Sequence, residues 1–152
     1  MSVLGFNYRL DEIRAAIGRV QLKKLERNNT RRKQLVEHYH ELLQELTPSV
    51  GIPFTDHRVQ SSYHLLCILL PKGINRVGFM ENMKSQRIQT SIHYPPVHTF
   101  SGYADLDRAG RGLLPVTDAV ASREVTLPLY PGLTNANVNS VVNAVAGSLK
   151  QV

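Results

Sequence analysis

The sequence has few of the features that mark specialised classes of protein. It contains one cysteine, Cys67, so no disulfide can form within the chain. No apolar run approaches the ~18 residues of a membrane-spanning helix, and the N-terminus lacks the apolar core of a signal peptide. The 42% hydrophobic and 20% charged content is ordinary for a globular protein, which excludes collagen and a disordered tail. These absences predict a soluble protein without a membrane partner, in the reducing cytoplasm.

The length of 152 residues indicates one folding unit, because domains commonly have ~100–200 residues. A chain of this size can bury roughly 68–70% of the surface exposed when it is unfolded. Two independent cores are not expected.

Basic residues are concentrated near the N-terminus. The net charge is +6, and residues 9–33 hold nine Lys and Arg against three Asp and Glu, while the rest of the chain is neutral. Any attraction for phosphate or an acidic partner should therefore centre on this segment. Nucleic-acid binding would need interleaved aromatic residues or a DNA-binding helix pair, and neither is evident, so we expect no nucleic-acid partner.

The first long element is predicted to be a helix over residues 11–46. Asp11 suits a helix N-terminus, and Thr47 before Pro48 is biased away from helical conformation. In its second half the apolar residues share one sector, as expected of a core-facing stripe. They are Leu35, Val36, Tyr39, Leu42, Leu43 and Leu46.

The first half of this helix carries apolar residues on two sides. Ile13 and Ile17 share one side, whereas Leu22 and Leu25 point to another. We expect one side to contact the chain's own small domain and the other a second body. Poor helix formers at residues 28–30 predict a bend there.

The remaining sequence alternates short strands and helices. We predict strands over residues 63–70, 88–94 and 124–127, and helices over 75–86, 117–122 and 134–149, with loop and helical turns between 99 and 114. The fold class is therefore α+β: a long N-terminal helix plus a small, mainly antiparallel sheet covered by helices. Residues 1–47 are expected to form an interface segment and helix, and residues 48–152 a small domain.

Three segments carry a resemblance to a known family. They are residues 5–22 (GFNYRLDEIRAAIGRVQL), residues 91–98 (SIHYPPVH, followed by Tyr103), and residues 127–134 (LPLYPGLT). In this order they resemble signatures of the DegT/DnrJ/EryC1/StrS family of sugar aminotransferases, which depend on pyridoxal phosphate (PLP). The second resembles the family's His-Tyr-x-Pro-x-His strand end.

The resemblance implies the C-terminal small domain of a fold-type I aminotransferase. Such enzymes pass an amino group from glutamate or glutamine to a keto sugar carried on a nucleotide. The large domain and its Schiff-base lysine lie upstream of the first motif in the family, and that region is absent here. We therefore predict that this chain alone is inactive and does not bind PLP covalently.

The resemblance also assigns roles to individual residues. Family members are homodimers with active sites at the subunit interface, and Asn7 matches the residue that reaches the cofactor phosphate of the partner subunit. Arg9 matches the arginine near the substrate or donor carboxylate, where a bidentate fork is useful. His93, Tyr94 and His98 match the strand end that lines the sugar-nucleotide side of the pocket.

Simpler interpretations remain open for these residues. Asn7 and Arg9 could be a turn and a surface cation, and Cys67 in an apolar run is expected to be a buried, inert thiol. His93 and His98 are separated by two prolines and accompany no thiolate or carboxylate cluster, so we expect no metal site. A different class of function also remains open: a non-catalytic dimerisation or interaction module that self-associates through exposed apolar surface.

Overall fold

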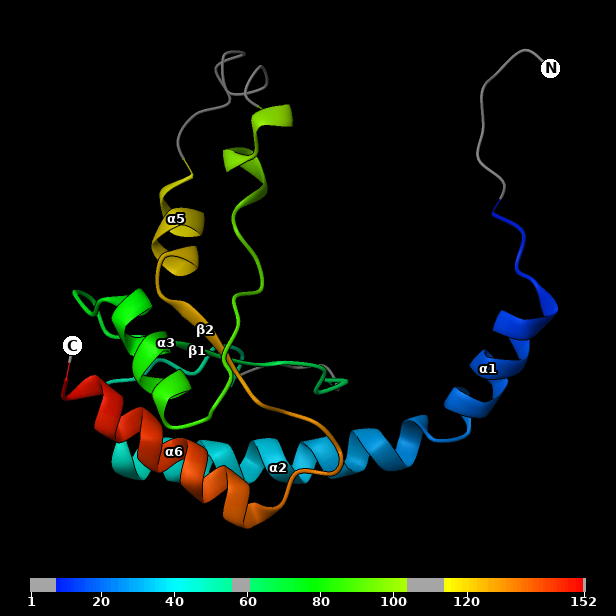
Figure 1. Cartoon of the computed structure of the whole chain (residues 1–152), viewed down its shortest axis with the longest axis horizontal. Coiled ribbons are helices and arrows are strands. Elements are labelled where there is room, and N and C mark those ends of the chain that lie inside the picture. The colour runs from blue at the N-terminus through cyan, green and yellow to red at the C-terminus, as the bar shows by residue number, and fades with distance from the viewer. Residues whose placement is uncertain (1–7, 56–60, 104–113, 152) are drawn as a thin grey trace.

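The chain forms a helical arm that leads into a body of two strands covered by helices (Figure 1). The computed structural model describes residues 8–55, 61–103 and 114–151. In chain order the elements are α1 (Glu12–Leu22), α2 (Leu25–Leu46), β1 (Leu66–Leu69), α3 (Arg76–Ser85), the 3-10 turns η1 (Val97–Thr99) and η2 (Ser101–Tyr103), α5 (Pro115–Ala121), β2 (Glu124–Leu127) and α6 (Asn135–Leu149). The predicted α+β class is confirmed.

The N-terminal helix is interrupted earlier than predicted. It breaks at Lys23 and Lys24, and α2 then runs without interruption through residues 28–30. The predicted bend is wrong because the polar side chains there stay on the helix surface, where the Arg32 guanidinium donates to the Asn29 side chain. They do not compete for the helix backbone, and Asn28 N–H still bonds to the Lys24 carbonyl at 3.0 Å.

The sheet has two antiparallel strands whose two faces differ in chemistry. Leu66 pairs with Leu127 and Ile68 with Val125, and these four residues are buried in the core. Because side chains alternate along a strand, the opposite face carries Cys67 with its partner Thr126, and Glu124. The sheet therefore has an apolar inner face and a polar outer face.

The predicted strand over residues 88–94 is wrong. Only Ser91 pairs with the sheet, in a two-way backbone bridge to Thr126 with N···O distances of 2.8 and 3.2 Å. The ladder ends there because His93 N–H donates to the Glu124 side chain instead of a strand carbonyl, and residues 95–96 are prolines without N–H groups. The predicted strand over 63–70 is also shorter than expected, at Leu66–Leu69.

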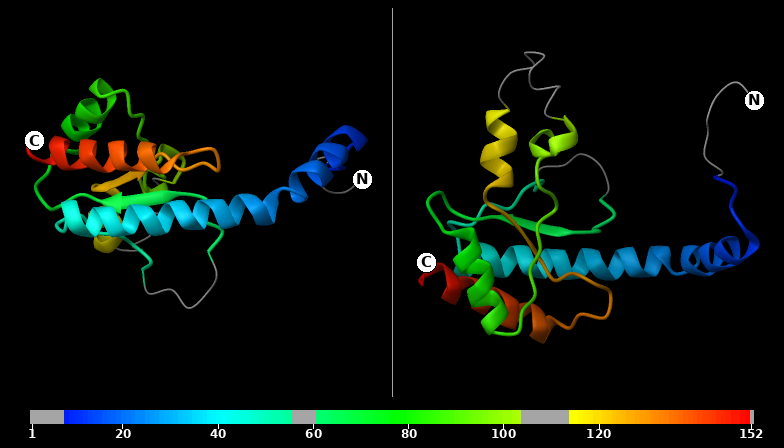
Figure 2. Two further views of the ribbon diagram at one scale, coloured as in Figure 1. Left: turned by 90° about the horizontal axis from the view of Figure 1, so that it is seen from below. Right: turned by 45° about the horizontal axis from the view of Figure 1, so that its top comes forward.

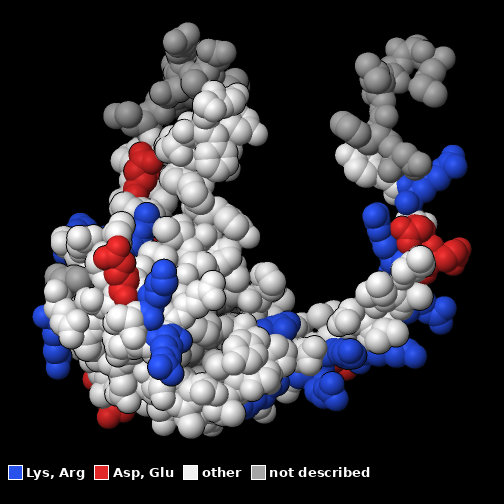
Figure 3. Space-filling model, in the orientation of Figure 1, with Lys and Arg blue, Asp and Glu red and all other residues white. Residues whose placement is uncertain are grey.

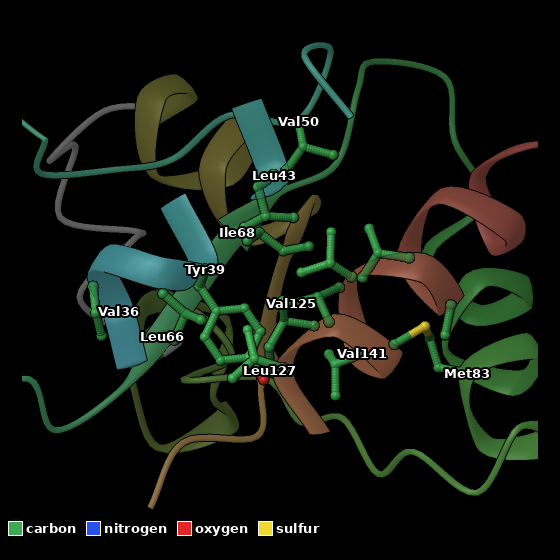
Figure 4. Packing of buried hydrophobic residues seen from close by; sticks show 14 of the residues in the cluster. Val36, Tyr39, Leu43, Val50, Leu66, Ile68, Met83, Val125, Leu127 and Val141 are labelled. Atoms are coloured by element: carbon green, nitrogen blue, oxygen red, sulfur yellow. The ribbon is translucent and has the colours of Figure 1, made fainter. Parts of the chain in front are cut away.

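One apolar core joins the inner face of the sheet to three helices. Figure 4 shows Tyr39 and Leu43 of α2 packed toward Ile68 and Val125, with Val141 of α6 and Met83 of α3 beyond them. The predicted core stripe of α2 is buried at Leu35, Val36, Tyr39 and Leu43. Leu42 is only partly buried, and the prediction is wrong at Leu46, which is 44% exposed at the end of the helix.

Three helices begin where their sequences predict. Asp11, Asn75 and Thr134 each accept a hydrogen bond from a backbone N–H in the first turn, at 2.8, 3.2 and 3.1 Å. In α6 the Asn137 side chain also accepts from the Thr134 N–H, which completes a capping box. These local bonds explain why α3 and α6 lie close to their predicted bounds.

The arm, residues 8–24, extends away from the body (Figure 2). None of the residues of α1 is buried, so the prediction that one of its sides packs on the chain's own small domain is wrong. The exposed fractions are 74% at Ile13, 69% at Leu22 and 48% at Leu25 on α2. Both apolar sides of this region remain available to another body.

Candidate functional site

Two of the three motif segments meet in one groove on the polar side of the sheet. It has a volume of about 370 Å³. Its walls come from three parts of the chain: residues 64–65 before β1, residues 89–91 with His93, and residues 126–130. Folding therefore brings the His-Tyr-Pro segment beside the segment that begins at Leu127, although they are some thirty residues apart in the sequence.

The backbone of the His-Tyr-Pro segment is tied to β2. Ser91 makes the two-way backbone bridge to Thr126, and His93 N–H donates to Glu124 Oε2 at 3.0 Å. Glu124 and Thr126 are 7% and 5% exposed. Two buried polar side chains thus hold His93 against the sheet.

The same two side chains extend into a hydrogen-bond chain. The Thr126 hydroxyl donates to Glu124 Oε1 at 2.6 Å, and His93 Nδ1 lies 2.8 Å from Thr126 Oγ1. The Cys67 sulfur lies 3.3 Å from the same hydroxyl oxygen. Burial raises the pKa of the Cys67 thiol, Glu124 raises it further, and the contact with Thr126 acts in the opposite direction. The raised pKa favours the protonated form of the thiol. The prediction that Cys67 is buried is wrong, because the side chain is half-buried on the outer face of the sheet.

The other two predicted residues of this segment lie farther out. Tyr94 is 72% exposed, and its ring packs edge-to-face on that of His93 with 4.8 Å between centroids. His98 lies in η1, where its Nε2 is 3.0 Å from Asp118 Oδ1 on α5. Only His93 of the three lines the groove.

The described part of the first motif, residues 8–22, lies on the arm at the other end of the molecule. Arg9 precedes α1 on the arm, which Figure 1 places away from the two strands. Asn7 lies outside the described residues. Figure 3 shows Lys and Arg side chains along the arm, as expected from the basic segment 9–33. Within the described chain, the predicted site residues therefore do not form one cluster.

Tyr39 supports the groove from the core side. Its hydroxyl donates to the Pro128 carbonyl at 2.9 Å, which fixes the turn after β2. Burial, with a smaller contribution from Tyr130, raises the pKa of Tyr39 well above its ordinary value. Tyr39 therefore stays a neutral hydrogen-bond donor at neutral pH.

Sequence reasoning missed Glu124, Thr126 and His64 as site residues. The strand over 124–127 was predicted, and its alternation of Glu and Thr with Val and Leu indicates a polar face. That alternation was the available signal for two of the three residues. His64 lines the groove only because β1 lies beside β2, which the sequence does not reveal.

Neither a metal site nor a membrane-spanning helix is found among the described residues. Across residues 8–55, 61–103 and 114–151, no group of His, Cys, Asp or Glu side chains could hold a metal ion. None of the helices in those ranges has the length and apolar character to cross a bilayer.

The arm and the body together share the fold of a portion of known sugar aminotransferases. The chain belongs to the DegT/DnrJ/EryC1/StrS aminotransferase family, which it matches over residues 1–146.

Individual relatives match nearly all of this chain but less than half of their own lengths. The chain is 36% identical over 141 residues to the erythromycin biosynthesis sensory transduction protein EryC1 of Saccharopolyspora erythraea, covering 92% of this chain and 37% of EryC1. The structure of S. venezuelae DesV in complex with a ketimine intermediate matches with a TM-score of 0.82 and 31% identity, over 99% of this chain and 40% of DesV.

A third match supports the fold alone. Helicobacter pylori PseC, an aminotransferase involved in the biosynthesis of pseudoaminic acid, has a TM-score of 0.87 at 23% identity. The match covers 99% of this chain and 40% of PseC. The chain thus spans about two fifths of the length of these relatives.

Proposed function

We propose that this chain is the C-terminal part of a PLP-dependent aminotransferase that acts on nucleotide-linked keto sugars. Residues 48–152 would form its small domain, and residues 1–47 an interface segment and helix. The observation that carries the proposal is the groove lined by His93. Two segments that resemble motifs of the aminotransferase family line this groove together. The groove contributes the sugar-nucleotide side of the pocket.

The residues present do not fit covalent attachment of PLP. A Schiff-base lysine needs a desolvated pocket, usually with an acid that faces the pyridine nitrogen of the cofactor. All six lysines of the chain are exposed: Lys23, Lys24, Lys33, Lys72, Lys84 and Lys150. This supports the proposal that the lysine lies on a large domain outside these residues.

The arm supports a role at an interface between domains and subunits. Its apolar residues are exposed on more than one side, and its cations lie on the same helix. In a homodimer, Asn7 would donate to the cofactor phosphate of the partner subunit, and Arg9 would bind the carboxylate of the substrate or of the glutamate or glutamine donor. Tyr94 and His98 would complete the sugar side around His93.

A second function is favoured by the same arm. A helix without a buried residue, with apolar groups at Ile13, Ile17 and Leu22, also suits a non-catalytic dimerisation module. The two functions make different predictions for the groove. A part of an aminotransferase needs the groove to bind a sugar nucleotide, whereas a dimerisation module does not.

Sugar-nucleotide binding tests the groove directly. We expect dTDP-, UDP- or GDP-linked keto sugars to shift the NMR amide signals of residues 89–93 and 126–130. His93→Ala should weaken this binding roughly two- to tenfold, the range for one net hydrogen bond. His38→Ala, on α2, is the matched control and should bind as wild type does. Shifts confined to the arm, or none with any of the three nucleotides, would favour the dimerisation module.

Absorbance titration with PLP tests the proposal that the Schiff-base lysine lies outside these residues. After borohydride reduction, mass spectrometry should find no stoichiometric adduct on the chain, because each lysine lies in solvent. A stoichiometric adduct at a single lysine would show that the cofactor site is contained in these residues and would contradict the proposal.

A further inference from the structure

Glu124 is a buried carboxylate whose two oxygens both receive hydrogen bonds from the site. Oε2 accepts from the His93 backbone N–H at 3.0 Å, and Oε1 accepts from the Thr126 hydroxyl at 2.6 Å. A carboxylate can only accept hydrogen bonds, so the Thr126 hydroxyl must be the donor in this pair. The hydroxyl has one proton, and that proton is engaged in the bond to Glu124. The direction of the Thr126 hydrogen bond is therefore determined by its neighbour.

That direction determines which nitrogen of His93 carries a proton. Thr126 Oγ1 lies 2.8 Å from His93 Nδ1, and its own proton points to Glu124. The oxygen can then only accept, so Nδ1 must be the donor. The Cys67 thiol, 3.3 Å away, is placed to donate to the second lone pair of the same oxygen. The proton of the Thr126 hydroxyl and both lone pairs of its oxygen are then engaged in hydrogen bonds.

The consequence appears on the other side of the imidazole ring. In a neutral histidine with a proton on Nδ1, the Nε2 atom has a lone pair and acts as an acceptor. His93 lines the groove, and within the described residues its ring makes hydrogen bonds through Nδ1 alone. The longer contact of Nδ1 to Ser91 Oγ, at 3.4 Å, is compatible with a shared Nδ1–H donor.

We propose that Glu124 and Thr126 are positioning residues that hold His93 in the Nδ1–H form, so that Nε2 accepts a hydrogen bond from a sugar hydroxyl in the groove. The identity of that ligand rests on the proposed function, whereas the protonation pattern of His93 does not. Neither residue needs to touch the ligand. Both act through the orientation of the ring and the placement of its proton.

The proton on His93 can be observed without any ligand. In a long-range proton–nitrogen NMR correlation of the ¹⁵N-labelled chain at about pH 8, we expect Nδ1 of His93 to be protonated and Nε2 to be unprotonated. His93→Gln assigns the signal, and His38, on α2, is the internal reference. A wild-type chain with the proton on Nε2 would overturn the proposal, whatever the variants do.

Variants of Thr126 separate positioning from simple support of the fold. Thr126→Val keeps the branched shape and removes the hydroxyl, so we expect the proton to shift toward Nε2 while the His38 signals stay unchanged. Thr126→Ser restores a hydroxyl and should restore the wild-type pattern. If Thr126→Val leaves the His93 tautomer unchanged, the threonine does not position the proton and the proposal fails.

Binding then tests the purpose of the arrangement. With the nucleotide sugars named above, Thr126→Val should lower affinity roughly two- to tenfold, and Thr126→Ser should not. Equal affinity of Thr126→Val and wild type would overturn the role toward the ligand. A chain that shows the Nδ1–H form but binds none of these sugars would instead contradict the proposed function alone, because the tautomer is measured without them.

Discussion

At the scale of single residues, the site is organised by hydrogen bonds from the sheet and from α2. Glu124 and Thr126 hold His93 from the outer face, and Tyr39 reaches the same region from the core through the Pro128 carbonyl. A buried hydroxyl requires a partner, so the carbonyl and the tyrosine stabilise each other. Tyr39 therefore links the packing of the core to the shape of the groove.

Tyr39→Phe tests this link. Loss of the 2.9 Å hydrogen bond should lower the free energy of unfolding by about 1 kcal/mol, since the Pro128 carbonyl is left without its donor. Urea unfolding followed by circular dichroism measures the change. Tyr130→Phe is the matched control, because Tyr130 is exposed, and it should stay within about 0.5 kcal/mol of wild type.

The hydrogen bond between Tyr39 and the Pro128 carbonyl also predicts that the stability of the fold depends on pH. The pKa of Tyr39 is raised by burial above its ordinary value of 10.0, so the folded state holds this proton more tightly than the unfolded state. The stability that Tyr39 contributes is therefore complete below pH 10.0 and is lost as the pH rises toward its value in the folded state. The stability difference between wild type and Tyr39→Phe should shrink above this pH. A difference that stays constant would contradict the assignment.

At the scale of elements, the starts of three helices follow from local sequence, whereas the strand ends do not. Each of α1, α3 and α6 begins after a residue whose side chain accepts from the first turn. By contrast, the segment after Ser91 leaves the sheet because the Glu124 side chain takes the hydrogen bond of the His93 N–H. The competitor is thirty-one residues away in sequence, and no local pattern identifies it.

Thr134→Ala tests the local control of α6. Removal of the cap hydroxyl, which accepts from the Asn137 N–H at 3.1 Å, should cost about 1 kcal/mol of unfolding free energy. The loss should appear in global unfolding, because α6 packs on both α2 and α3. Asn143→Ala, at an exposed position within the same helix, should be neutral or slightly stabilising. Equal losses in both variants would mean that the cap does not control the helix.

At the scale of the whole molecule, the arm and the body depend on different partners. The body has its own core, to which α2, α3, α6 and both strands contribute. The arm has apolar residues but no buried side chain in α1. We therefore expect the body to fold without the arm, and the arm to be stabilised by contacts with another polypeptide or another domain.

Paired substitutions separate the two parts. Ile17→Asp on α1 should change the unfolding free energy by less than about 0.5 kcal/mol, whereas Leu43→Ala in the core should cost about 2–5 kcal/mol. In sedimentation velocity, wild type should self-associate through the arm and Ile17→Asp should do so less. A large loss of stability in Ile17→Asp would show that the arm packs on the body.

The sequence by itself determined where α1, α3 and α6 begin, because the side chains of Asp11, Asn75 and Thr134 bond within the first turn of each helix. It also predicted the β2 strand and carried the family resemblance. It predicted most of the core stripe of α2, although not the exposure of Leu46, and it named His93. Tertiary structure decided that His93 is hydrogen-bonded to Glu124 and Thr126 and that His98 pairs with Asp118. The physical reason is that side-chain hydrogen bonds between distant segments depend on which strands pair, and strand pairing is not encoded in any local pattern.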